Sequence, residues 1–199
     1  FFMTVFGIMG CMALLICGFA IKDSVHALSP LQYGDIYRYD ALAITSTGNF
    51  DACEELLKNS NGVSSLQEVA VDSVTLTANG DDEALQLFVL PDEADLSPYV
   101  SLKSGSEPLA LGDSGMILTR NAADLLGVGA GDAATVKTSS LDEAPVPINA
   151  IADNYLGNAV YVTQSAYQQL FGEDVEPNGF YLALSGSDSE KEAFAEDLA

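Results

Sequence analysis

The chain begins with a long apolar segment and continues as a series of short alternating patterns. Residues 1–21 contain 17 apolar side chains, three glycines and one threonine, and no charged group. Because a helix rises about 1.5 Å per residue, such a segment reaches about 30 Å, the thickness of the hydrocarbon core of a bilayer. We therefore predict a transmembrane helix over residues 1–22, with membrane lipid around residues 1–21.

Two other interpretations of this segment stay open. A signal peptide needs a positive n-region and an apolar core of about 7–15 residues, and the segment has neither, although Gly18-Phe19-Ala20 resembles a cleavage site. A lipoprotein anchor would use Cys11, but the apolar run continues for ten residues beyond it. The chain opens on Phe1 and ends within an amphipathic pattern, so we expect it to be part of a longer membrane protein.

Polar and apolar residues alternate in many short stretches of the remaining chain, as they do in half-buried strands. These stretches predict strands over 36–44, 84–90, 115–119, 133–138, 145–151, 160–162 and 180–184. The alternation over 69–76 slips at Asp72-Ser73, which indicates two short strands or a bulge. The turn at 79–82 then predicts a hairpin with the strand that begins at Ala84.

Short helices are expected between these strands, each after a residue that favours a helix start or before a glycine that favours a helix end. They are a helix capped by Asp51 and Glu54 and ended by Asn61-Gly62, a helix over 121–126 ended by Gly127, a helix over 165–171 capped by Thr163 and ended by Gly172, and a last helix capped by Ser189 and Glu192. The mixture of short strands and helices predicts an α+β fold with two lobes.

Charge narrows the possible partners of this second part. The chain has 29 acidic and 7 basic residues, a formal net charge of -22, and all of these groups follow residue 21. Nucleic acids and anionic membrane surfaces are bound through clusters of lysine and arginine, which the sequence lacks. An acidic body with so few basic residues fits the outer side of the membrane, and we expect no nucleic-acid partner.

No set of residues in the sequence assembles a catalytic or metal site. The single histidine, His26, has no second histidine to share a metal, and the cysteines lack a metal-binding spacing, so Cys53 is interpreted as a small buried residue. The glycine-rich run 127–132 follows a helix instead of opening one, unlike a phosphate cradle. Asp81 and its acidic neighbours lack EF-hand spacing, and 112–115 lacks the G-x-S-x-G of a nucleophile elbow. We therefore expect no catalytic, cofactor-binding or metal-ligating residue, and no enzyme.

Several strings of residues resemble FtsX-like ABC transporter permeases of the MacB type. They are Thr4 to Leu15 (TVFGIMGCMALL), Gly18 to Ser24 (GFAIKDS), Gln32 to Asp40 (QYGDIYRYD), Gly115 to Leu118 (GMIL), Leu125 to Val128 (LLGV) with Gly131-Asp132, and Asp153 to Asn158 (DNYLGN) with Tyr161 to Thr163 (YVT). The resemblance spans most of the chain, is most specific in its first strings and is weakest over 60–110.

The resemblance implies a membrane helix that rises from the cytoplasm into an extracytoplasmic domain over 23–199. In such domains a porter-like lobe, here 23–100 and 146–199, surrounds a smaller inserted lobe, here 101–145. The resemblance further implies a permease subunit of the bacterial cell membrane that pairs with a cytoplasmic ABC ATPase subunit and with the other permease half. Such subunits couple ATP-driven motion of the membrane helices to the outer domain, for export or for transmission of force. The family has no cofactor or catalytic residue to carry over, and the sequence does not name the substrate.

Two further functions stay open from the sequence: a sensor or adhesion ectodomain anchored by a single helix, and a secreted hydrolase behind a signal peptide. Three more hydrophobic spans after residue 199 would support the permease. If the outer domain acts as a lever, Gly34 and Asp35 near the helix exit are expected hinge positions. Their replacement is then expected to uncouple ATP hydrolysis from the response to substrate.

Overall fold

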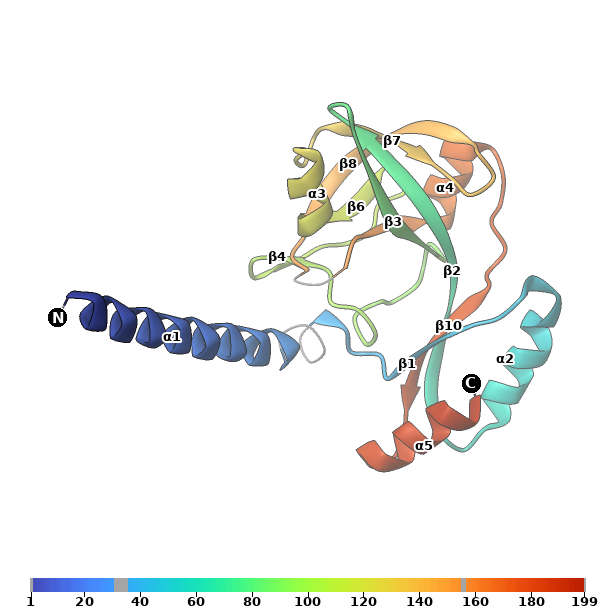
Figure 1. Cartoon of the computed structure of the whole chain (residues 1–199). Helices are drawn as coiled ribbons and strands as arrows, with labels where there is room; N and C mark the ends of the chain where they lie inside the picture. Colours follow the sequence, from blue (N-terminus) through green and yellow to red (C-terminus); the bar gives the residue numbers. More distant parts are fainter. Residues whose placement is uncertain (1, 31–35, 155–156, 199) are drawn as a thin grey trace.

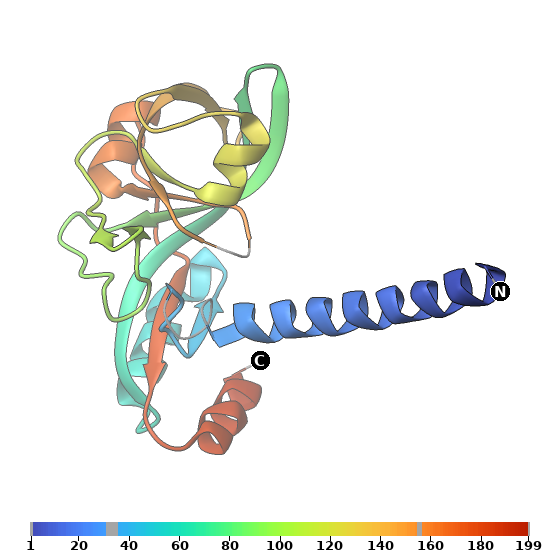
Figure 2. The ribbon, with the colours of Figure 1, turned by 90° about the vertical axis from the view of Figure 1, so that its left-hand side faces the viewer.

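Helix α1 (Phe2–Pro30) extends away from the rest of the protein as a single rod (Figures 1 and 2). The computed structural model describes residues 2–30, 36–154 and 157–198. Within α1, Val5–Ser24 is a 20-residue span of mean hydropathy 2.1 that the body does not bury. An uncovered apolar surface of this size is unfavourable in water and favourable in hydrocarbon. The predicted helix is confirmed, and it is long and apolar enough to cross a membrane.

The rest of the described chain folds into a sheet-rich body with short helices around it (Figure 1). Its elements are β1 (Ala41–Ile44), η2 (Thr47–Asn49), α2 (Phe50–Asn59), β2 (Val63–Ala78), β3 (Asp81–Leu90), β4 (Lys103–Ser104), β5 (Glu107–Pro108), β6 (Met116–Thr119), α3 (Arg120–Leu126), β7 (Ala133–Lys137), β8 (Glu143–Ala152), β9 (Ala159–Thr163), α4 (Gln164–Phe171), β10 (Gly179–Leu184) and α5 (Asp188–Leu198). Eight strands form one sheet in the order β1-β10-β2-β3-β9-β6-β8-β7, and β4 pairs with β5. The predicted α+β class with an N-terminal helix is confirmed.

Strand β2 is a single strand of 16 residues that runs through both halves of the body (Figure 1). Its first half pairs with β10, and its second half pairs with β3 on one edge and β7 on the other. The prediction of two strands or a bulge near Asp72-Ser73 is wrong, because the register with β3 is continuous from Ala70 to Ala78. The alternation slips because Val69 and Val71 pack in one core and Val74 and Leu76 pack in another on the opposite face of the strand.

Beyond Ala70 the strands close into a barrel, because β7 returns to pair with β2 and completes the ring β2-β3-β9-β6-β8-β7 (Figure 2). Alternate residues of the six strands, together with α3 and α4, form its core, which includes Leu76, Leu87, Leu118, Val136, Ile148 and Val160. Asn79 and Gly80, with φ of 55° and 94°, join β2 to β3. An Asn-Gly pair favours this type of hairpin turn, and the predicted hairpin is confirmed.

A smaller layer lies below the barrel in Figure 1 and consists of β1, β10 and the first half of β2, with α2 and α5 beside them. Phe180 and Leu182 of β10 and Leu57 of α2 are fully buried in its core. Phe50, the first residue of α2, stacks on Phe180 with ring centroids 4.5 Å apart. Burial of these side chains attaches α2 to the sheet.

Helix ends follow the sequence closely in the barrel and less closely in the smaller layer. The Thr163 hydroxyl accepts a hydrogen bond from the Ala166 N–H at 3.2 Å, and α3 and α4 end at glycines with positive φ, so these predictions are confirmed. In the smaller layer, Glu54 pairs with Lys58 instead of completing a capping box with Asp51, and the Ser187 N–H donates to Glu190 where the sequence predicted Ser189 with Glu192. The last helix begins earlier because Gly186, with φ of 112°, turns the chain directly after β10.

The strand pairing divides the body at boundaries that differ from those of the lobes implied by the resemblance. The barrel uses residues 70–90 and 116–163, so the segment 101–145 supplies only part of it. Strand β8 crosses the expected boundary between 145 and 146, because it pairs with both β6 and β7 along its length. The reason is the closure of the barrel, which joins strands that are far apart in the sequence.

Candidate functional site

The candidate functional site is the joint at which the chain enters the body after α1. We call residues 36–40 the exit segment and residues 91–102 the docking loop. An isolated antiparallel bridge pairs Tyr37 with Val100. The flanking hydrogen bonds run from the N–H groups of Arg38 and Tyr39 to the Tyr99 carbonyl oxygen (2.7 and 3.0 Å) and from the Ser101 N–H to the Ile36 carbonyl oxygen (2.8 Å). The exit segment is therefore held along the docking loop in the manner of a short paired strand.

Aromatic rings continue this contact into the core. Tyr37 and Tyr39 lie 5.5 Å apart between ring centroids, and Tyr39 lies 5.0 Å from Tyr181 of β10. Tyr181 also lies 6.2 Å from Tyr99 of the docking loop. Burial, with the neighbouring tyrosines, raises the pKa of Tyr181 and of Tyr161 well above the ordinary tyrosine value, so both rings stay neutral. Packed aromatic pairs of this kind contribute about 0.5–1.5 kcal/mol each.

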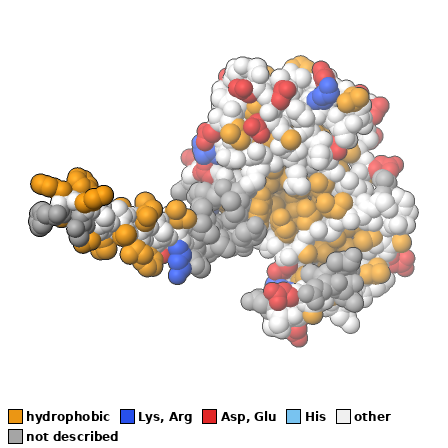
Figure 3. Space-filling model, viewed as in Figure 1, with side chains coloured by type: hydrophobic (Ala, Val, Ile, Leu, Met, Phe, Trp, Pro, Cys, Tyr) orange, Lys and Arg blue, Asp and Glu red, His pale blue; other side chains and the backbone are white. Residues whose placement is uncertain are grey.

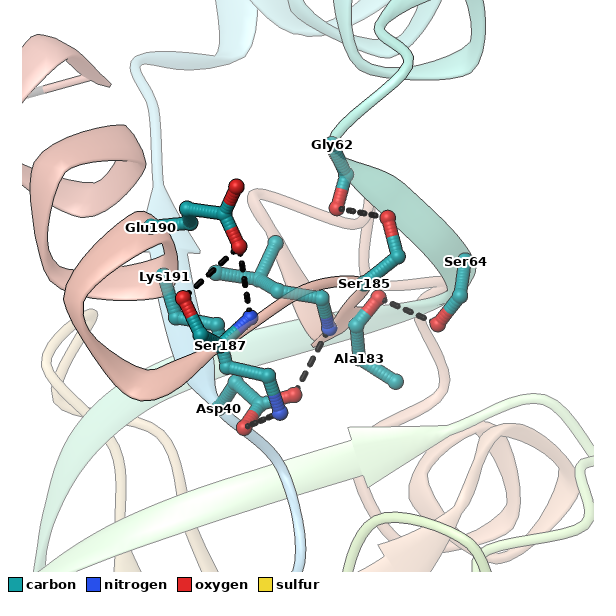
Figure 4. A network of polar contacts seen from close by, with 9 residues as sticks. Asp40, Gly62, Ser64, Ala183, Ser185, Ser187, Glu190 and Lys191 are labelled. Carbon is teal, nitrogen blue, oxygen red and sulfur yellow. Dashed lines mark hydrogen bonds and ion pairs between the residues drawn. The ribbon is translucent and has the colours of Figure 1, made fainter.

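Asp40 joins the exit segment to the other end of the described chain (Figure 4). Its Oδ2 accepts a hydrogen bond from the Leu184 N–H at 2.7 Å, and its Oδ1 pairs with Lys191 Nζ of α5 at 2.8 Å. Its own N–H donates to the Leu182 carbonyl oxygen at 2.8 Å. The carboxylate therefore binds the end of β10 and α5 together, and we call Asp40 with Leu184 and Lys191 the clasp.

Asn178 lies where the smaller layer meets the barrel. Its side chain accepts a hydrogen bond from the Val71 N–H at 2.7 Å and donates one to the Val71 carbonyl oxygen at 2.9 Å. Its backbone N–H donates to the Val69 carbonyl oxygen, and its own carbonyl oxygen accepts from the Thr45 N–H. The next residue is Gly179, where a Cβ would lie 2.9 Å from the Ala43 carbonyl oxygen, so a side chain does not fit there. Asn178 thus fixes the angle between the two parts of the body.

The residues weighed for chemistry in the sequence lie apart from one another. Cys53 is partly buried in the core of the smaller layer, and the run 127–132 is the end of α3 followed by a turn, as its sequence indicates. Asp81 lies in β3, at the hairpin turn. Over residues 2–30, 36–154 and 157–198, no three histidine, cysteine, aspartate or glutamate side chains are grouped to hold a metal ion. Gly34 and Asp35, the expected hinge, lie outside the described residues.

The sequence did not identify the docking loop, the clasp or Asn178. The docking loop makes its contacts through backbone groups, which leave no pattern in the side chains. The clasp joins Asp40 to residues more than 140 positions away. The feature of the sequence that could have indicated the joint is the pair of tyrosines, Tyr37 and Tyr39, between Ile36 and Ile44, which is unusual for a strand with one solvent face.

Comparison with known proteins adds a likeness of fold. No protein-family model matches the sequence, and the search of curated proteins gives no match. The structure is similar to the extracellular domain of the noncanonic ABC-type transporter YknZ from Gram-positive bacteria, with 16% identity and a TM-score of 0.47 over 76% of this chain and 86% of that chain. It is also similar to the periplasmic region of MacB from Actinobacillus actinomycetemcomitans, with 12% identity and a TM-score of 0.45 over 79% of this chain and 80% of that chain.

Proposed function

We propose that this chain is the first membrane helix and the outer domain of an FtsX-like ABC permease half. In this proposal the outer domain moves with the membrane helices when ATP is hydrolysed, either to export a substrate or to transmit force. Its partners are a cytoplasmic ABC ATPase subunit and the other permease half, in the membrane of a bacterial cell. The domain acts by motion and contact, with no catalytic step of its own.

The observation that carries the proposal is the double attachment of the exit segment. A passive anchor needs only a flexible connection between its helix and its domain. Here residues 36–40 pair with the docking loop on one side and enter the clasp on the other. A displacement of the exit segment therefore displaces both parts of the body, which is what a lever requires.

The small number of lysine and arginine residues in the body supports an outer location. Residues 22–199 carry the whole net charge of -22, and α1 carries no charged residue before Lys22. Lysine and arginine favour the cytoplasmic side, so an acidic body with few basic residues fits the outer side. We infer that the body is extracytoplasmic and that lipid surrounds residues 1–21.

Copurification tests this proposal. The natural full-length protein, tagged at a terminus and solubilised from its own membranes in mild detergent, is expected to bring down an ATPase with Walker motifs in a fixed ratio. Vanadate-sensitive ATP hydrolysis should accompany it. As a control, residues 1–199 alone are expected to lose the ATPase, because the cytoplasmic contacts are expected downstream. A full-length protein that purifies without any ATPase, with a single membrane span, would support an anchored sensor or adhesion domain instead.

A cross-link tests the lever itself. Paired residues of an antiparallel bridge have Cα atoms about 4.5–5.5 Å apart, within the range of a disulfide. In a background without the natural cysteines, Tyr37→Cys with Val100→Cys locks the exit segment to the docking loop. Because the two are proposed to move together, the oxidised lock should leave the ATPase activity of the purified complex within about twofold of its reduced form. A lock that abolishes activity would show that the joint opens during the cycle and would refute the lever as drawn here.

A further inference from the structure

A groove of about 460 Å³ lies along the docking loop, and no residue of the exit segment lines it. It runs between the docking loop, the segment 108–111 that begins at the last residue of β5, and Thr163, the cap of α4. Leu96, Val100 and Leu102 are buried at its floor, and Leu109 and Leu111 are partly exposed along its side. Figure 3 shows hydrophobic side chains gathered between the barrel and the smaller layer. A volume of this size is that of a pocket for a drug-sized molecule.

The rim of the groove is acidic. Asp92, Glu93 and Asp95 line it, and no lysine, arginine or histidine does so among the residues that the structure describes. Asp92 accepts two hydrogen bonds from the Ser165 N–H and hydroxyl, and Asp95 accepts two from the same groups of Ser97. These bonds lower the pKa of both carboxyl groups, so the rim stays negative under mildly acidic conditions.

The docking loop connects this groove to the joint. Val100 forms part of the groove floor and also pairs with Tyr37 of the exit segment. Ser97 lines the groove, and its carbonyl oxygen accepts a hydrogen bond from the Arg38 guanidinium at 3.0 Å. A molecule in the groove therefore contacts the same few residues that hold the exit segment.

We propose that the groove binds a small amphipathic cation, a positive group beside an apolar group, and that its occupancy stiffens the joint between the docking loop and the exit segment. The apolar part lies against Leu109 and Leu111, and the positive group lies at the rim beside Glu93. The binding site stands without the proposed permease function, whereas the meaning of the stiffened joint for transport rests on that function. Charge complementarity favours this occupant over an anion or over a second copy of this acidic chain.

Three peptides serve as probes in titration calorimetry with the full-length protein in nanodiscs of zwitterionic lipid. Acetyl-Leu-Lys-Leu-amide carries both required groups, acetyl-Leu-Glu-Leu-amide reverses the charge, and acetyl-Ser-Lys-Ser-amide removes the apolar part. We expect the first to bind at least tenfold more tightly than either of the others. Empty nanodiscs give the background that membrane partitioning contributes. Equal binding of the three peptides would overturn the proposal.

Two charge reversals separate the groove from the general acidity of the body. Glu93→Lys removes a rim carboxylate, and Glu55→Lys makes the same change of net charge on the exposed side of α2. At 0.15 M salt charges are screened beyond about 8 Å, so only the change at the rim should weaken binding, by about tenfold. Leu111→Asn should weaken it by a similar factor, because it replaces apolar surface by polar surface on a side chain of similar shape. Equal losses in the Glu55 and Glu93 variants would mean a nonspecific cation layer and would refute the site.

Hydrogen exchange tests the effect on the joint without any ATPase partner. The N–H groups of Arg38, Tyr39 and Ser101 form the bonds between the exit segment and the docking loop. Saturating acetyl-Leu-Lys-Leu-amide is expected to slow their exchange at least threefold, with no change in the Glu93→Lys variant. Binding without protection of these groups would refute the proposed effect of the groove on the joint. The absence of binding would refute the groove as a site and would leave the permease proposal unaffected.

Discussion

The clasp makes a quantitative prediction, because its two bonds differ in strength. The bond from the Leu184 N–H to the Asp40 carboxylate is 2.7 Å long and partly buried, and bonds of a charged group to a buried partner are worth about 1.5–3 kcal/mol. The ion pair with Lys191 has side chains that are 27% and 26% exposed, so solvent screening limits it to about 1 kcal/mol or less. Asp40→Ala should therefore lower the free energy of unfolding by about 2–4 kcal/mol, and Lys191→Met by at most about 1 kcal/mol.

Urea unfolding of the detergent-solubilised protein, followed by the near-ultraviolet dichroism of the tyrosine cluster, measures these differences. Asp40→Asn keeps an oxygen that accepts from the Leu184 N–H but loses the charge, which weakens that bond and removes the ion pair, so its cost should lie between those of Lys191→Met and Asp40→Ala. Glu192→Gln, on an exposed neighbouring position of α5, is the matched control and should change stability by less than about 0.5 kcal/mol. A double-mutant cycle of Asp40→Asn with Lys191→Met should give a coupling of about 1 kcal/mol or less. If Lys191→Met costs as much as Asp40→Ala, the ion pair rather than the backbone bond carries the clasp, and the reasoning fails.

Three further predictions concern other joints of the body. Asn178→Ala removes two bonds to Val71 and should destabilise the protein by about 2–4 kcal/mol in the same urea assay, while Asn178→Asp should recover less than half, since it keeps only the acceptor. Thr163→Val removes the cap of α4 and the hydrogen bond that the Thr163 hydroxyl donates to the Gly112 carbonyl oxygen, so it should cost about 1–3 kcal/mol, seen as a lower midpoint of thermal unfolding. Thr163→Ser keeps the hydroxyl and should restore most of this loss. The hydrogen bond from the Gly105 N–H holds the pKa of Asp153 below its usual value; partial burial opposes this shift and Arg120 adds to it. The stability that the Asp153 carboxylate contributes is therefore present above its unfolded pKa and is lost as the pH falls through its folded pKa. Asp153→Asn should therefore be less stable than the wild type at neutral pH, and its free energy of unfolding should fall less steeply as the pH is lowered. An acid slope equal to that of the wild type would contradict this assignment.

Local signals account for the parts of the fold that could be predicted from the sequence. An uncharged run of 21 residues, an Asn-Gly turn between two strands and a threonine before α4 each act over a few neighbouring residues, and each led to the observed element. The ring of six strands was not predictable in this way, because its closure depends on the pairing of Thr75–Thr77 with Thr135–Lys137, about 60 residues later. The alternation of polar and apolar residues in one strand does not specify which strand it pairs with.

The joint was hidden from the sequence for a related reason. The stretch from Pro91 to Pro108 reads only as turns, yet its backbone binds the exit segment and its side chains line the groove. Tyr37 and Tyr39 fall within the strand expected over 36–44, but they precede β1, where Tyr39 packs on Tyr181 and Tyr37 packs on Tyr39. The two tyrosines are thus explained by their ring contacts in the folded chain and not by a place in a strand.

The connections of the joint also indicate where the body can bend. The exit segment reaches the barrel through the docking loop and Asp92, which binds the start of α4, and it reaches the smaller layer through β1 and the clasp. Strand β2 joins both parts without a break, so they cannot separate without losing its ladders to β10 and β3. Rotation about residues 69–71 keeps both ladders, but it strains the two bonds that Asn178 makes with Val71 and the shared core in which Tyr181 packs near Phe88. In the proposed lever, a pull on the exit segment should therefore change the angle between the barrel and the smaller layer before it separates them, because separation also breaks the ladders of β2.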